Sequence, residues 1–284
     1  MNAYNLLRCP LCHSDMYLKG SSLACRGERQ HCYDIAASGY VNLLPPGKKS
    51  NAKTGDDREM LKSRRAFLSC GHYDKISECA ARAALKSLPE RDSIIFADAG
   101  CGDGYHALNI EACLKAENIR SLALGLEASK RGADMAARLG SRLGSSSFFA
   151  AANIFDMPLR DRSADVIFSM FAPVPDGEAL RVLKDDGVLV VCSSGSRHLW
   201  EMREIIYGEP KLSPPLDRTP EGFEHIDHTS LSYSFTLDSP ELIAALFTMT
   251  PFYWRCPREG RERLLSLDAL TVRAETEYNV YKKK

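Results

Sequence analysis

The 284-residue sequence is long enough for one large α/β domain and a smaller module, since domains commonly contain about 100–200 residues. Its 37 basic and 37 acidic residues give a formal net charge of zero, so the overall charge indicates neither a nucleic-acid partner nor an acidic one. No stretch approaches the roughly 18 apolar residues of a membrane helix, and the N-terminus lacks the apolar core of a secretory signal, so we expect a cytoplasmic protein.

Residues near the N-terminus have the spacing of a zinc site. Cys9 and Cys12 form a C-x-x-C turn, and Cys25 with His31 would complete a tetrahedral shell of three sulfurs and one nitrogen. Cys32 competes with His31 for the fourth position. A thioredoxin-like redox pair would need a strand and a helix beside the C-x-x-C turn, and this segment shows neither pattern. Four protein ligands leave no open position, so the predicted zinc is structural.

A segment rich in Pro, Gly and charged residues follows from about residue 40 to 66, and this composition predicts a flexible, basic surface segment. We therefore expect a zinc-binding module over 1–40, a basic linker over 41–72 and an α/β domain over 73–284.

Beyond the linker, apolar helical stretches alternate with short apolar strands, which is typical of a doubly wound parallel sheet of the Rossmann-like class. The last sixty residues add two alternating strands around a helix and predict a closing antiparallel hairpin. The predicted strands are Ile94–Ala97, Leu122–Leu126, Phe148–Ala151, Val166–Met170, Val188–Cys192, Leu231–Leu237 and Tyr278–Tyr281. The predicted helices are Ile76–Leu88, Tyr105–Ala116, Lys130–Leu143, His198–Tyr207 and Pro240–Phe247.

A glycine loop follows the first of these strands and leads directly into a helix. It contains Asp98, Gly100, Gly102, Asp103 and Gly104 in the spacing D-x-G-x-G-x-G, which differs from the dinucleotide fingerprint G-x-G-x-x-G. Glycines let the backbone approach a ligand closely, and the helix N-terminus presents free N–H groups. The two aspartates would repel a pyrophosphate and attract a sulfonium cofactor with an amino group. The loop therefore favours S-adenosylmethionine over a nicotinamide.

The ends of the next two strands supply further candidate cofactor contacts. Glu127 ends the second strand, where a carboxylate can accept hydrogen bonds from ribose hydroxyls. Asn153 and Ile154 follow the third strand and would flank the adenine, one through a hydrogen bond and one through contact. Taken singly, Asp98 could be a turn-forming residue and Glu127 a helix N-terminal charge, but their order at strand ends favours a cofactor site.

With these residues in place, the chain closely resembles the bacterial large-subunit ribosomal RNA guanine-N1 methyltransferases over nearly its whole length. The combination of a zinc module, this linker and this cofactor loop is specific. The resemblance is carried by Cys9-Pro10-Leu11-Cys12, Gly39-Tyr40-Val41-Asn42-Leu43-Leu44-Pro45, Arg64-Arg65-Ala66-Phe67-Leu68, Gly71-His72-Tyr73, Asp98 to Gly104, Arg197-His198-Leu199 and Met249-Thr250-Pro251-Phe252.

The resemblance implies methyl transfer from S-adenosylmethionine to N1 of one guanine in a hairpin of 23S rRNA, by a homodimer whose zinc modules embrace the RNA. It implies that Tyr73 and His198 contact the cofactor beside Gly102 and Asp103. It also implies that the zinc ligands are Cys9, Cys12, Cys25 and His31, although the gap between the last two looks two residues longer than in the relatives.

Methylation at guanine N1 requires an unpaired base, because N1 lies on the Watson–Crick edge. Phe171 follows the fourth strand, where this fold brings substrate to the cofactor, and it is the candidate for stacking on the base, although it could equally belong to the core. His198, Glu201 and Asp176 are candidates for accepting the N1 proton. None of them has the spacing of a recognisable acid/base pair, so the catalytic residue stays open.

Two basic clusters could contact RNA phosphates, which would position the RNA without reading its sequence. The alternative is a solvated surface, and acidic residues dilute the first cluster. The residues of the clusters are Lys48, Lys49, Lys53, Arg58, Lys62, Arg64 and Arg65, then Arg255, Arg258, Arg261 and Arg263, with a basic tail at Lys282–Lys284.

Two other functions compete with RNA methylation. A small-molecule methyltransferase would share the cofactor loop but would not need a zinc module or a basic linker. A non-enzymatic, zinc-dependent RNA-binding protein would not need the complete loop from Asp98 to Gly104 together with Glu127. A measurement of cofactor binding distinguishes the non-enzymatic RNA-binding protein from the two methyltransferases.

Overall fold

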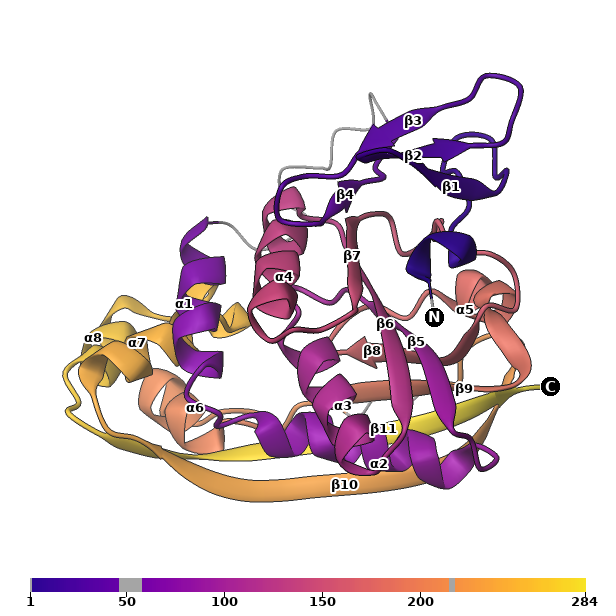
Figure 1. Cartoon of the computed structure of the whole chain (residues 1–284). Coiled ribbons are helices and arrows are strands. Elements are labelled where there is room, and N and C mark those ends of the chain that lie inside the picture. Colours follow the sequence, from indigo (N-terminus) through magenta and orange to yellow (C-terminus); the bar gives the residue numbers. More distant parts are fainter. Residues whose placement is uncertain (1, 46–57, 215–217) are drawn as a thin grey trace.

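The computed structural model describes residues 2–45, 58–214 and 218–284. Its main feature is an eight-stranded sheet with the strand order β10-β11-β9-β8-β5-β6-β7-β4 (Figure 1). The strands from β4 to β9 in this order run parallel, whereas β11 pairs antiparallel with both β9 and β10. The predicted Rossmann-like sheet with a closing antiparallel hairpin is confirmed. The strands are β4 (Val41–Asn42), β5 (Ser93–Ala99), β6 (Arg120–Glu127), β7 (Phe148–Ala151), β8 (Ala164–Met170), β9 (Leu183–Ser194), β10 (Phe223–Leu237) and β11 (Leu270–Lys283).

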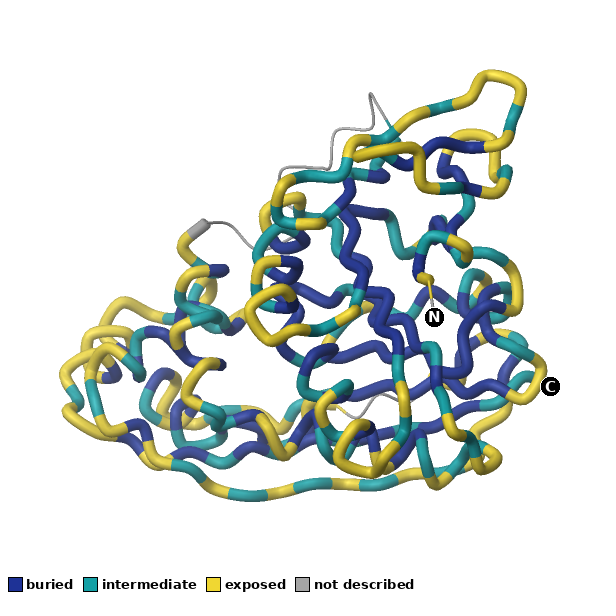
Figure 2. Tube along the Cα trace, in the orientation of Figure 1, coloured by how far each residue is buried: buried dark blue, intermediate teal, exposed yellow. Residues whose placement is uncertain are grey.

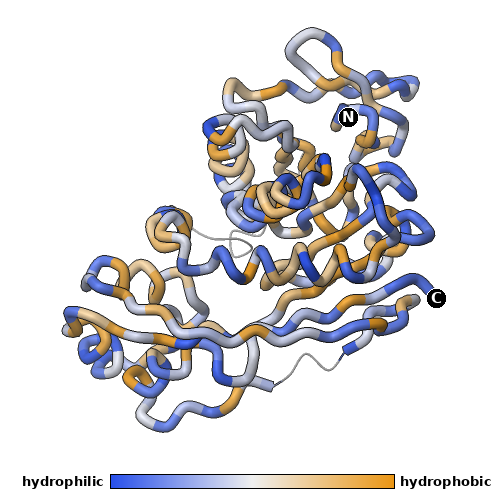
Figure 3. The backbone as a smooth tube through the Cα atoms, turned by 60° about the horizontal axis from the view of Figure 1, so that its bottom comes forward, coloured by the Kyte–Doolittle hydropathy of each residue, from blue (hydrophilic) through white to orange (hydrophobic). Residues whose placement is uncertain are grey.

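Side chains alternate across the central strands and build one hydrophobic core on each face of the sheet. Phe96 and Val166 belong to the first core, and their neighbours Ala97 and Ile167 belong to the second. Figure 2 shows these central strands as mostly buried. Figure 3 shows the matching pattern in hydropathy, with hydrophobic residues concentrated on the strands and hydrophilic ones at many of the outer turns.

Helices cover the first face, where the apolar positions of α2 recur at helical spacing and lie buried against the sheet. The short helix α5 and the N-terminal module cover the second face. The helices are α1 (Arg58–Leu68), α2 (Asp74–Ser87), α3 (Tyr105–Ala116), α4 (Lys130–Arg142), α5 (Asp176–Val182), α6 (Trp200–Tyr207), α7 (Pro240–Thr248), η2 (Pro251–Trp254) and α8 (Arg258–Leu265).

The N-terminal module is docked on the sheet rather than separated from it (Figure 1). It consists of η1 (Ala3–Leu6) and a small antiparallel sheet of β1 (Met16–Lys19), β2 (Ser22–Cys25) and β3 (Cys32–Asp34). The backbone N–H of Arg8 donates to the carbonyl of Pro158 at 3.0 Å, and that of Arg160 donates to Leu6 at 2.9 Å. These bonds join the module to the segment between β7 and β8.

The segment expected to be a flexible linker contains an ordered helix, α1, whose side chains Leu61, Phe67 and Leu68 are buried. The segment is rich in charged residues, so its composition predicts a loop, although its few apolar residues lie on one face of a helix. Lys48, Lys49 and Lys53 lie outside the described residues. Within the residues described, no helix is both long and apolar enough to span a membrane.

Candidate active site and metal centre

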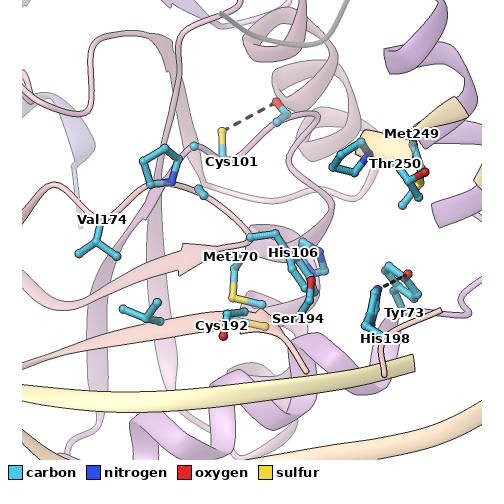
Figure 4. A pocket seen from close by; sticks show the side chains of 18 of the residues that line it. Tyr73, Cys101, His106, Met170, Val174, Cys192, Ser194, His198, Met249 and Thr250 are labelled. Carbon is cyan, nitrogen blue, oxygen red and sulfur yellow. Dashed lines mark hydrogen bonds between the residues drawn. The ribbon is translucent and has the colours of Figure 1, made fainter. Parts of the chain in front are cut away.

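A cavity of about 880 Å³ opens at the carboxyl ends of β5 and β8. The chain leaves β5 toward β6 on one side of the sheet and reaches β8 on the other, and ligands of such sheets bind at this reversal of strand order. Figure 4 shows the cavity with the side chain of Tyr73, which precedes α2, and with side chains from α3, β8, β9 and the turn after α7. Gly100–Asp103 form one wall, and Met170–Val174 form another.

The glycine loop adopts backbone conformations that favour glycine. Gly100, Gly102 and Gly104 have φ values of +85°, +56° and +82°. A Cβ atom on Gly104 would lie 2.8 Å from Cβ of Ala136, so the loop also packs closely against α4. The loop leads into α3, which turns the first N–H groups of that helix toward the loop.

Three acidic side chains gather around this loop. Asp98 is fully buried, and neither carboxylate oxygen has a hydrogen-bond partner among the described residues. Burial, and then the nearby charge of Glu127, raises the pKa of Asp98 to about 7. Glu127 accepts hydrogen bonds from the backbone N–H of Gly102 at 3.0 Å and of Ser129 at 2.8 Å. Unpartnered buried carboxylate oxygens fit a ligand that brings positive charge and hydrogen-bond donors.

The third acid, Asp103, is 2% exposed, and burial raises its pKa while Arg65 and Arg64 oppose that rise. Its Oδ2 lies 3.7 Å from Nη1 of Arg65 on α1. Helix α1 therefore contributes positive charge to the glycine loop.

The cavity brings together only part of the predicted cofactor set. Its lining includes Tyr73, Gly100, Gly102, Asp103 and His198 but excludes Asp98, Gly104, Glu127, Asn153 and Ile154. Oδ1 of Asn153 accepts a hydrogen bond from the backbone of Phe155 at 3.0 Å, and Ile154 packs against the second core. The adenine contacts assigned to these two residues stay predictions.

Tyr73 and His198 form a buried pair in the cavity (Figure 4). The hydroxyl of Tyr73 lies 3.2 Å from Nε2 of His198. Nδ1 of His198 lies 2.9 Å from the carbonyl oxygen and 3.1 Å from the backbone nitrogen of Glu275. Burial lowers the pKa of His198 to about 4. Both ring nitrogens are thus engaged in a neutral imidazole, which argues against His198 as a proton acceptor.

Phe171 has an unusual conformation for a large side chain. Its φ is +54°, a left-handed backbone that disfavours bulky residues, and 41% of its surface is exposed. Its ring centroid lies 6.0 Å from those of both His106 and His198. Strain of this kind clusters at functional sites. His106 was not predicted from sequence, because a single histidine on a helix carries no distinguishing pattern.

The other two acid/base candidates differ in position. Oε2 of Glu201 accepts a hydrogen bond from the backbone of Arg273 at 2.8 Å, which ties α6 to β11 away from the cavity lining. Asp176 lines the cavity, with Oδ2 held by Arg218 and by the backbone of Glu221. Its Oδ1 is buried without a hydrogen-bond partner in the described part of the chain.

In the N-terminal module, the ligand atoms of Cys9, Cys12, Cys25 and His31 all lie within 4.8 Å of one another. Sγ of Cys9 lies 3.4 Å from Nδ1 of His31, and Sγ of Cys12 lies 3.6 Å from Sγ of Cys25. A tetrahedron with zinc–sulfur bonds of 2.3 Å has edges of about 3.8 Å, so the cluster fits structural zinc. Cys32 is exposed and outside the cluster, so His31 is the fourth member.

Two models of known protein families match separate parts of the chain. The family model described as "RlmA, N-terminal" matches residues 7–52, and the model described as "Methyltransferase domain" matches residues 97–191. The 23S rRNA (guanine(748)-N(1))-methyltransferase of Streptomyces fradiae is 30% identical over 279 residues, covering 95% of this chain and 93% of that protein.

Two Bacillus subtilis proteins also match. YxjB of strain 168 is 28% identical over 281 residues, which are 96% of each chain. It is named as a 23S rRNA (guanine-N(1)-)-methyltransferase, and its name does not specify the position of the guanine. The crystal structure of the YcgJ protein aligns with 72% of this chain and 98% of its own, at 14% identity and a TM-score of 0.46.

Proposed function

This chain belongs to the 23S rRNA (guanine-N1)-methyltransferase family, and from that membership we propose that it transfers a methyl group from S-adenosylmethionine to N1 of one guanine in a hairpin loop of 23S rRNA. The observation that supports this best is that Phe171, whose ring is exposed and whose backbone is left-handed, lies in the same cavity as the glycine loop.

The acidic groups at the loop suit the cofactor. S-adenosylmethionine supplies, when bound, an electrophilic methyl group on a sulfonium centre that leaves as a neutral thioether. Asp98 and Asp103 would attract its positive charge, and the carboxylate of Glu127, oriented by two backbone N–H groups, would accept hydrogen bonds from ribose hydroxyls. Tyr73 and His198, which line the cavity, would contact the cofactor as uncharged groups.

The target base must leave its stack before N1 is accessible. Phe171 would then hold it flat, since base–aromatic stacking is worth about 1–3 kcal/mol per base. Positioning against the methyl group supplies most of the acceleration, because the sulfonium is already a good leaving group. Among the sequence candidates, Asp176 is the carboxylate whose unpartnered Oδ1 lies at the cavity.

A surface near the cavity mouth offers groups that bind single-stranded RNA. Trp254 is 63% exposed, and the guanidinium of Arg261 lies 4.9 Å from the ring centroid of Tyr253. Arg255 and Arg258 flank this turn, whereas Arg263 donates to the carbonyl of Ile205 and serves the fold. We assign RNA phosphate contacts to Arg255, Arg258 and Arg261 and stacking to Trp254.

The zinc module would hold one structural zinc through Cys9, Cys12, Cys25 and His31. The division into a module over 1–40, a linker over 41–72 and a methyltransferase domain over 73–284 is part of the proposal, with α1 as an ordered part of the linker. A homodimer, implied by the family resemblance, completes it.

The test is incubation of the purified protein with labelled S-adenosylmethionine and unmethylated 23S rRNA, followed by primer extension. A single stop at a hairpin guanine supports the proposal, because N1 methylation blocks base pairing. Cofactor binding without RNA labelling would favour a small-molecule methyltransferase. Absence of binding heat in calorimetry would leave only a non-enzymatic RNA-binding protein.

A further inference from the structure

Two histidines flank Phe171, and they differ in how their ring nitrogens are used. Both nitrogens of His198 are engaged, by Tyr73 and by the backbone of Glu275. His106, on the first turn of α3, has one partner: its Nδ1 lies 2.9 Å from Oγ of Ser77. Its Nε2 has no hydrogen bond within residues 2–45, 58–214 and 218–284, although its ring lines the cavity (Figure 4).

Hydrogen-bond accounting sets the tautomer of His106. Ser77 is fully buried on α2, and His106 is the single side-chain partner of its hydroxyl in the described structure. If His106 donated this bond, the buried hydroxyl proton would be left without an acceptor, which costs about 1–3 kcal/mol. Ser77 is therefore the donor to Nδ1, and the ring proton resides on Nε2.

The surroundings also keep this ring neutral. Burial, and then the charge of Arg64, lowers the pKa of His106 to about 3. At neutral pH the cavity therefore contains one uncharged N–H donor beside the exposed ring of Phe171, with a centroid separation of 6.0 Å between the two rings.

Resting on the function proposed above, we propose that Nε2–H of His106 donates a hydrogen bond to O6 of the target guanine and that Ser77 is a positioning residue that fixes this tautomer. Transfer of the N1 proton to the carboxylate of Asp176, the candidate acceptor at the cavity, moves negative charge onto O6 of the guanine. A donor placed at O6 stabilises that charge while the N1–carbon bond forms and the sulfur–carbon bond breaks, with its electron pair leaving on the neutral thioether. Adenine presents an amino donor in the same place, so two donors would oppose each other. His106 thereby selects guanine.

The experiment measures single-turnover methyl transfer to the hairpin with either guanine or 6-thioguanine at the mapped position. Sulfur accepts hydrogen bonds more weakly than oxygen. The sulfur atom also changes the intrinsic reactivity of N1, but this change is the same for every protein and therefore cancels when the guanine-to-thioguanine rate ratio of a variant is compared with that of the wild type. The variant His106→Phe keeps a ring but lacks the donor, and His225→Phe on the exposed edge strand is the matched control. Cofactor affinity by calorimetry and melting temperature report folding.

We expect His106→Phe to lower the guanine rate about 10²-fold, the usual cost of losing such a donor, and to shrink the guanine-to-thioguanine ratio by at least about 10-fold. Ser77→Ala, which keeps the ring, should shift the ratio the same way by about 2–10-fold. An unchanged ratio in a folded, cofactor-binding His106→Phe protein overturns the assignment while leaving the methyltransferase function intact. Failure of the wild-type protein to methylate any RNA overturns both.

Discussion

Nη1 of Arg65 lies 3.7 Å from the buried carboxylate of Asp103, which connects helix α1 to the cofactor loop. A Cβ atom on Gly102 would lie 3.2 Å from Nη1 of the neighbouring Arg64, so both guanidinium groups reach the loop. Phe67 on the same helix is fully buried. The helix is therefore a wall of the active site, and its charge offsets part of the acidic field that the cofactor would meet.

Replacing Arg65 by Met should leave the charge of Asp103 buried without its ion pair. We expect a loss of about 1–3 kcal/mol in the free energy of unfolding, measured in urea. Adding Asp103→Asn should restore part of that loss, because the unpaired charge is then absent. Lys62→Met, at an exposed position of the same helix, is the control. Additive effects of the two substitutions would contradict the pairing.

Cofactor binding should depend on pH through Asp98, whose folded pKa is about 7. S-adenosylmethionine carries positive charge, so it favours the ionised carboxylate, and affinity should rise from pH 5.5 to 7.5 by at most about tenfold per unit and then level off. Calorimetry on Asp98→Asn should give weaker and pH-independent binding. A wild-type affinity that stays constant across this window would exclude the role.

In the protein without cofactor, ionisation of Asp98 should lower the free energy of unfolding as pH rises, whereas it increases cofactor affinity. The folded pKa of Asp98 lies above the ordinary value of 3.8, so between about pH 4 and 7 the folded state binds the extra proton. Stability should therefore fall as pH rises through that window. Asp98→Asn should remove this contribution to the slope, which denaturation at several pH values would measure.

Phe171→Gly should separate stability from RNA binding. Glycine tolerates the φ of +54°, and the phenyl ring is exposed, so the melting temperature should stay constant or rise slightly. The KM for RNA should increase about 5–150-fold, which corresponds to the 1–3 kcal/mol of one lost stacking contact. Phe155→Gly, a similarly exposed ring outside the cavity, should leave KM unchanged. A core role for Phe171 would instead appear as a large loss of stability.

The metal assignment gives a matched pair of substitutions. Cys25→Ser should lower the bound zinc, measured by atomic absorption, and destabilise the protein because it removes a ligand from a closed site. Cys32→Ser changes an exposed thiol seven residues later and should retain full zinc content. Equal zinc loss in both variants would contradict the choice of His31 over Cys32.

Sequence patterns predicted the elements whose signal is local. The ends of the apolar strands β5 to β9 were predicted within five residues of their observed bounds, and the glycine loop was predicted in place, because strand periodicity and turn chemistry act over short distances. Helix α1 was missed because it packs against α7, about 180 residues away in sequence. His106 was missed for the same reason, since its partner Ser77 lies on another helix.

The N-terminal module shares a hydrophobic core with the catalytic sheet, so its folding affects the stability of the whole protein. Leu7, Leu23 and Val41 from this region share a hydrophobic core with Leu124 and Ile167 of the central strands. Loss of zinc would therefore strip a cover from the catalytic sheet as well as unfold a short module. Exposed apolar surfaces of this kind promote aggregation and degradation by proteases. The amount of active enzyme would therefore depend on the availability of zinc.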